Sequence, residues 1–157
     1  MGGYSKAMRR QSDTFDKTAM RLGYAGLLPP AIFVCIALAD PAQRWIILAA
    51  SFGYAAFIFS FLGGVWWGLA MSSRTALPWM WFAAVSPSLI ALALFLPWTF
   101  GWEWPRPAMM VLAALILVSP AVDWAMGWDV PLPQGWLRLR VHLSLGLAVL
   151  TLLLSLL

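Results

Sequence analysis

The chain has 157 residues, of which 62% are hydrophobic and 10% are charged, and its formal net charge is +4. Soluble domains carry about 25% charged residues, so this composition excludes an ordinary soluble domain and indicates a protein surrounded by lipid. We therefore interpret the positive charge as a signal of membrane orientation and expect no binding of nucleic acid.

Five long apolar stretches follow one another along the chain, each long enough to cross a bilayer as a helix. Because the connections between them are short, neighbouring helices should be antiparallel and in contact. The predicted fold is an all-α integral membrane protein, an antiparallel bundle of five transmembrane helices. We expect a basic cytoplasmic tail over 1–17 and one membrane domain over 18–157, with spans at about 18–38, 43–71, 77–96, 107–124 and 136–157.

Lysine and arginine are distributed unequally between the two ends of these spans. With the N-terminus in the cytoplasm, eight of them lie on the cytoplasmic side and two on the opposite side. Since positive residues accumulate in cytoplasmic loops, the N-terminus is predicted inside and the C-terminus outside. The eight are Lys6, Arg9, Arg10, Lys17, Arg21, Arg74, Arg138 and Arg140, and the two are Arg44 and Arg106.

Small residues mark one face of the second span. Ser60, Gly64 and Gly68 recur every four residues, with Gly63 beside them. Small residues allow a neighbouring backbone to approach closely, which is a main source of helix cohesion in lipid. These four residues are predicted to serve helix packing, either within the chain or between two copies of it.

Prolines interrupt the backbone hydrogen bonding of several spans. Each proline leaves a carbonyl one turn earlier without its usual donor, and in hydrocarbon that carbonyl needs another partner. Nearby serine hydroxyls, a tryptophan N–H or water could supply the missing donor. The prolines are Pro29, Pro30, Pro87 and Pro120, and the serines are Ser86, Ser88 and Ser119.

Asp123 is the most informative single residue, because an unpaired carboxylate at the inner rim of a span is energetically costly. Arg138 and Arg140 begin the fifth span on the same side and point to nearly opposite faces, since two residues turn a helix by about 200°. We expect one of them to pair with Asp123 and the other to extend toward lipid phosphates, with His142 close by. The pair is interpreted as a structural clamp, and a ligand or proton site is the alternative.

The chain contains eleven tryptophans, nine of which fall at the predicted ends of spans, where indole prefers the headgroup level. Trp66 and Trp67 lie deeper, so they complete the candidate binding or ion-pair cluster with Asp123, Arg138, Arg140 and His142. The nine expected anchors are Trp45, Trp79, Trp81, Trp98, Trp102, Trp104, Trp124, Trp128 and Trp136.

The residue types needed for catalysis are missing from this pattern. His142 and Cys35 are the only histidine and cysteine, and they fall at different depths, so neither a zinc nor a haem ligand set can be assembled. Glu103 is predicted outside and Asp123 inside, which separates the two carboxylates that acid–base chemistry would need. We predict a protein that is not an enzyme and holds no metal or cofactor.

Several segments resemble the domain of unknown function 3429, a family that includes proteins like transmembrane protein 69. The most specific is Ser60–Leu69, and the others are Leu22–Pro30, Ser86–Leu89, Asp123 and Trp136–Arg140. The resemblance implies a bacterial inner-membrane or mitochondrial protein of about five helices, and it implies no activity. We expect a multi-pass protein of the bacterial inner membrane. The residues that match the pattern are Gly63, Gly64, Trp67, Gly68, Asp123, Arg138 and Arg140.

Two functions fit these observations. The first is an accessory or assembly subunit that acts by helix–helix association, with membrane lipids around it and the subunits of a larger inner-membrane complex, or a second copy of the chain, as partners. The second is binding or transport of a small molecule such as a lipid, a tetrapyrrole or another hydrophobic metabolite, with the site in the cytoplasmic half of the bundle.

Overall fold

The computed structural model describes residues 17–157, and within that range it contains helices and no strands. Five helical stretches are long and apolar enough to cross a membrane: Lys17–Ala39, Pro41–Ser72, Pro78–Thr99, Arg106–Met126 and Trp136–Leu156. The prediction of an all-helical membrane protein with five spans is therefore confirmed. The expected tail over 1–17 lies outside the described residues except for Lys17.

The first and fourth spans are each built from two helices, which meet at Gly26–Leu27 and at Ser119. The second span begins with a short 3₁₀ helix that continues into a long α-helix, whose 29 residues extend over about 43 Å at 1.5 Å per residue. The helices are α2 (Lys17–Ala25), α3 (Leu28–Ala39), η1 (Pro41–Gln43), α4 (Arg44–Ser72), α5 (Pro78–Thr99), α6 (Arg106–Val118), α7 (Pro120–Met126) and α8 (Trp136–Leu156).

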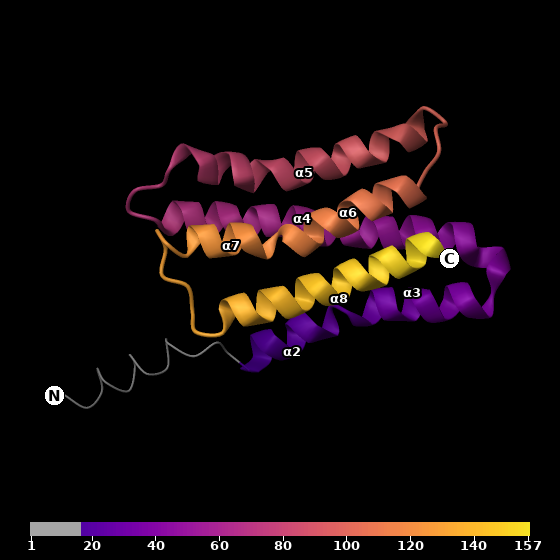
Figure 1. Cartoon of the computed structure of the whole chain (residues 1–157), viewed down its shortest axis with the longest axis horizontal. Coiled ribbons are helices and arrows are strands. Elements are labelled where there is room, and N and C mark those ends of the chain that lie inside the picture. The colour runs from indigo at the N-terminus through magenta and orange to yellow at the C-terminus, as the bar shows by residue number, and fades with distance from the viewer. Residues whose placement is uncertain (1–16) are drawn as a thin grey trace.

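The helices lie side by side as elongated rods (Figure 1). Helix α4 packs against α3, α5, α6 and α8, α6 also packs against α8, and α2 rests on α8. The start of α2, the α4–α5 connection and the α7–α8 connection lie at one end of the bundle, while the C-terminus lies at the other end (Figure 1). The apolar core between these helices includes Met80, Met109, Leu112 and Leu154, none of which has any exposed surface.

The serines beside two prolines replace the hydrogen bonds that those prolines remove. Pro87 leaves the carbonyl of Ala83 without a backbone donor, and Ser86 Oγ donates to it at 3.0 Å. Pro120 removes the donor one turn after Ile116, whose carbonyl accepts instead from Ser119, from Oγ at 2.8 Å and from the backbone N–H at 3.3 Å. The expectation of serine donors is confirmed at both positions. Pro87 lies within the continuous helix α5, whereas Pro120 begins α7.

Trp104 differs from the other tryptophans expected as interfacial anchors, because it is buried. Its indole N–H donates to the carbonyl of Leu94 at 3.1 Å, and its ring stacks on Trp98 and meets Phe52 edge to face. It therefore closes the core at one end of α5, while several of the other expected anchors remain exposed: Trp45, Trp79, Trp98, Trp102, Trp124 and Trp128.

Candidate functional site

Asp123 occupies the first turn of the short helix α7, directly after the break at Ser119–Pro120. The break ends α6, and Pro120 starts the new helix at a position where its missing N–H costs nothing. Asp123 has no exposed surface. A carboxylate in such a place is tolerated only when its oxygens accept hydrogen bonds and a cation compensates its charge.

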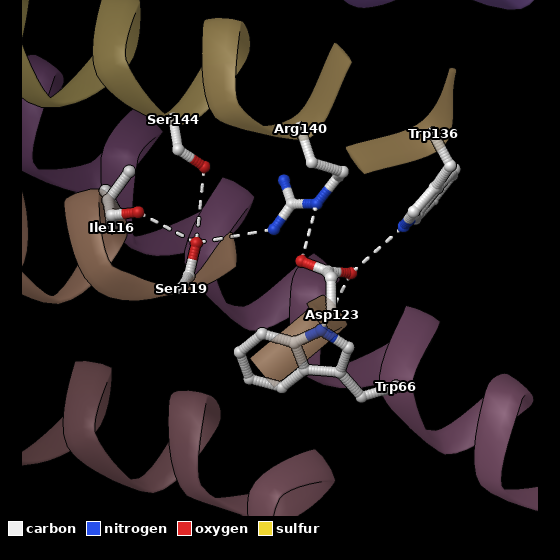
Figure 2. Close-up of polar contacts among 7 residues, drawn as sticks. All are labelled: Trp66, Ile116, Ser119, Asp123, Trp136, Arg140 and Ser144. Carbon is white, nitrogen blue, oxygen red and sulfur yellow. Dashed lines mark hydrogen bonds and ion pairs between the residues drawn. The ribbon is translucent and has the colours of Figure 1, made fainter. Parts of the chain in front are cut away.

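Three side chains from two neighbouring helices meet the carboxylate of Asp123 (Figure 2). Arg140 of α8 donates from Nε to Oδ2 at 3.0 Å and forms the ion pair. The other oxygen, Oδ1, accepts from the indole N–H of Trp66 on α4 and from that of Trp136 on α8, each at 3.2 Å. The carboxylate thus joins α4, α7 and α8.

Ser119 extends this network toward α6. Arg140 Nη2 donates to Ser119 Oγ at 3.3 Å, and the hydroxyl of Ser144 lies 3.3 Å from the same oxygen. Because Ser119 Oγ also donates to the carbonyl of Ile116, one turn before Pro120, the proline break and the ion pair share one hydroxyl (Figure 2). We call Trp66, Ser119, Asp123, Trp136, Arg140 and Ser144 the Asp123 cluster.

Three members of the Asp123 cluster come from one face of α8. Trp136, Arg140 and Ser144 are four residues apart, so they lie one above another on the helix. Gly135 precedes them with φ of 87°, a conformation that a residue without Cβ adopts easily, and so turns the chain into α8. From the sequence, Trp136 is expected as an interfacial anchor and Ser144 is not among the predicted site residues. The spacing of four on either side of Arg140 is the signal that could have found both.

The Asp123 cluster is suited to holding helices together. Arg140 is 6% exposed and Asp123 not at all, so each charge depends on the other for compensation. Removal of one partner from such a buried pair costs about 3–5 kcal/mol in soluble proteins, because the remaining charge stays buried. Both carboxylate oxygens are engaged by protein donors. This geometry favours the interpretation of the pair as a clamp.

Three other residues of the predicted cluster lie elsewhere. Arg138 is exposed on a different face of α8 from Arg140, as the angle between the two residues predicts. His142 Nδ1 lies 2.9 Å from the hydroxyl of Tyr24 on α2 and has no contact with Asp123 among the hydrogen bonds of the described residues. Trp67 is exposed and packs edge to face on Trp81 of α5.

The glycines predicted to serve helix packing occupy two different faces of α4. Gly63 is buried against α5, where an added Cβ would press on the backbone oxygen of Ala84 and lie 3.3 Å from the ring of Pro87. Gly64 and Gly68 are exposed, and an added Cβ would meet no atom within 4 Å. Ser60 is partly buried, more than Gly64 and Gly68 but less than Gly63, and it lines an apolar groove between α4 and α5.

Possible metal ligands do not gather anywhere in the part of the chain that the structure describes. Within residues 17–157 no three side chains of His, Cys, Asp or Glu lie close enough together to hold a metal ion. The polar chemistry of this region is concentrated in the Asp123 cluster.

The comparisons with known proteins agree with the resemblance carried by the glycine-rich part of α4, Asp123 and the start of α8. No curated protein and no solved structure matches the chain. The sequence model of the family described as "Protein of unknown function (DUF3429)" matches residues 15–157, which is nearly the whole chain. The chain therefore belongs to the DUF3429 family, and its helix bundle contains a buried ion pair between Asp123 and Arg140.

Proposed function

We propose that this protein is a non-catalytic integral membrane subunit, which acts by packing helix α4 against a transmembrane helix of another subunit in a larger membrane complex. The observation that carries the proposal is the contrast between adjacent glycines. Gly63 packs against α5, whereas Gly64 and Gly68 are exposed with open space beside them, and we call these two exposed glycines the track on α4.

The track on α4 has the features of a helix-packing surface in lipid. Gly64 and Gly68 are one turn apart, and the large apolar side chains of Phe61 and Trp67 stand beside them, both exposed. Small residues between large ones let a second helix approach closely and interdigitate with the flanking side chains, which is how transmembrane helices gain dispersion energy over lipid. Lipid tails fill such a track less well than a rigid helix does.

The way the polar groups are used supports the same proposal. The members of the Asp123 cluster bond to one another inside the bundle, so the outer faces of the spans present mainly apolar side chains. An accessory subunit needs such outer faces together with an internal clamp that fixes the relative rotation of its helices. The proposal includes the prediction that the protein is not an enzyme and holds no metal or cofactor.

The proposed location is the bacterial inner membrane, with the N-terminus in the cytoplasm. The α4–α5 and α7–α8 connections lie at the same end of the bundle as the start of α2, and this end carries Lys17, Arg21, Arg74 and Arg138. The unequal distribution of positive charge supports a cytoplasmic position for that end.

Affinity purification of the full-length tagged protein in a mild detergent, followed by mass spectrometry, tests the association. We expect other membrane subunits at a stoichiometric ratio, and we expect Gly64→Leu and Gly68→Leu to release them because the new side chains fill the track. Ala93→Leu is the matched control, since it enlarges an exposed position on α5 away from the track.

The results separate the possible partners. Loss of the co-purifying subunits from the glycine variants but not from the Ala93 variant supports the proposal. Recovery of an untagged copy of the same chain, with no other subunit, would replace the proposal with a homodimer. A preparation that stays monomeric, or equal loss of partners from all three variants, would overturn it.

A further inference from the structure

A second feature of the molecule is a cavity of about 400 Å³ between α2, α4 and α8. Its volume lies within the range of about 300–1,000 Å³ that small-molecule sites occupy. Its walls are apolar and include Ile58 and Val65 of α4 and Leu143 of α8, while Gly23 and Gly26 widen it on the first span. Leu22 and Phe61 line it and are also exposed, so the cavity reaches the surface that faces lipid.

Among residues 17–157, Arg140 is the only charged side chain that lines this cavity. The guanidinium has five N–H donors, and its Nε and Nη2 are engaged by Asp123 and Ser119. Its remaining nitrogen, Nη1, has no hydrogen-bond partner in the described part of the chain (Figure 2). Arg140 contributes to the wall of the cavity, and 8% of its side chain is accessible.

The charges around the cavity select the chemistry of its occupant. Asp123 already neutralises Arg140, and the described walls hold no other charged residue, so an anion would find no uncompensated cation there. Arg140 can still donate a hydrogen bond from Nη1, and in an apolar site such an N–H is stabilised by any acceptor oxygen. Ser144 lines the same wall, one helical turn after Arg140.

We propose that this cavity binds a neutral, hydrocarbon-rich molecule through a carbonyl oxygen that accepts a hydrogen bond from Nη1 of Arg140. The acyl ester of a lipid and a lipid-soluble quinone both present this chemistry. The cavity shares Phe61 with the packing surface on α4, but the donor that carries this proposal, Arg140, lies on α8.

Calorimetric titration of the full-length protein in micelles of an ester-free detergent, with empty micelles subtracted, tests the assignment. Each probe contains a ten-carbon chain. A decyl-substituted benzoquinone and methyl decanoate carry neutral carbonyls, and decanoate carries an anionic carboxylate. We expect at least one neutral probe to bind about tenfold more tightly than decanoate, since only the neutral probes avoid the field of Asp123. The stronger of the two neutral probes identifies the source as quinone or lipid ester.

Two variants locate the binding. Val65→Trp fills the cavity without removing any side chain of the Asp123 cluster and should abolish binding, while Val111→Trp, on an exposed position of α6, is the matched control. Arg140→Lys keeps the positive charge beside Asp123 but removes Nη1, and should weaken the neutral probes about tenfold. Should Arg140→Lys fail to fold, the two tryptophan variants still decide the outcome. Equal or tighter binding of decanoate, no binding of either neutral probe, or unchanged binding by Val65→Trp would each overturn the proposal.

Discussion

Replacement of Asp123 by asparagine is the most direct perturbation of the clamp. The new amide side chain of the Asp123→Asn variant can still present an oxygen to the indoles of Trp66 and Trp136, but its NH₂ group then turns N–H donors toward Arg140. Arg140, 6% exposed, loses its counter-charge without gaining access to water. Loss of one partner from a buried ion pair costs about 3–5 kcal/mol, so we expect a decrease of this size in the free energy of unfolding.

The assay is unfolding of the purified protein in mixed micelles by increasing sodium dodecyl sulfate, followed by circular dichroism. Asp129→Asn is the matched control, because Asp129 is exposed in the α7–α8 connection and its exchange should change stability little. A second substitution, Arg140→Met, should cost less in the Asp123→Asn background than alone, with a coupling energy of about 0.5–3 kcal/mol. Equal stability of the two asparagine variants, or strictly additive effects of the two cluster substitutions, would refute the clamp.

Two further expectations concern packing and topology. Gly63→Ala should lower the free energy of unfolding by about 1–3 kcal/mol, because the new Cβ presses on the backbone of Ala84, whereas Gly64→Ala should cause no loss. The same micelle titration measures both variants, and equal effects would contradict the assignment of the two glycines to different faces of α4. A reporter fused after Leu157 should be active only on the outer side of the membrane, and cytoplasmic activity would show that the proposed orientation is inverted.

Much of the molecule could be predicted from local properties of the chain. Apolar stretches of sufficient length predict membrane crossings, since backbone groups in hydrocarbon must bond within their own helix. The serine donors to Ala83 and Ile116 were also predictable, because a proline and its orphaned carbonyl lie within one turn of sequence. Helical geometry likewise showed that Arg138 and Arg140 could not both reach Asp123.

The rotation of each helix about its own axis was decided by packing between helices. Sequence spacing could not say which arginine faces inward, and only the seating of α8 beside α6 and α7 directs Arg140 to Asp123 and brings Trp136 and Ser144 with it. In the same way, the seating of α4 against α5 buries Gly63 and leaves Gly64 outside, although the two glycines are adjacent in the chain. A helix carries its pattern of side chains locally, but the direction in which that pattern points depends on neighbours that are distant in sequence.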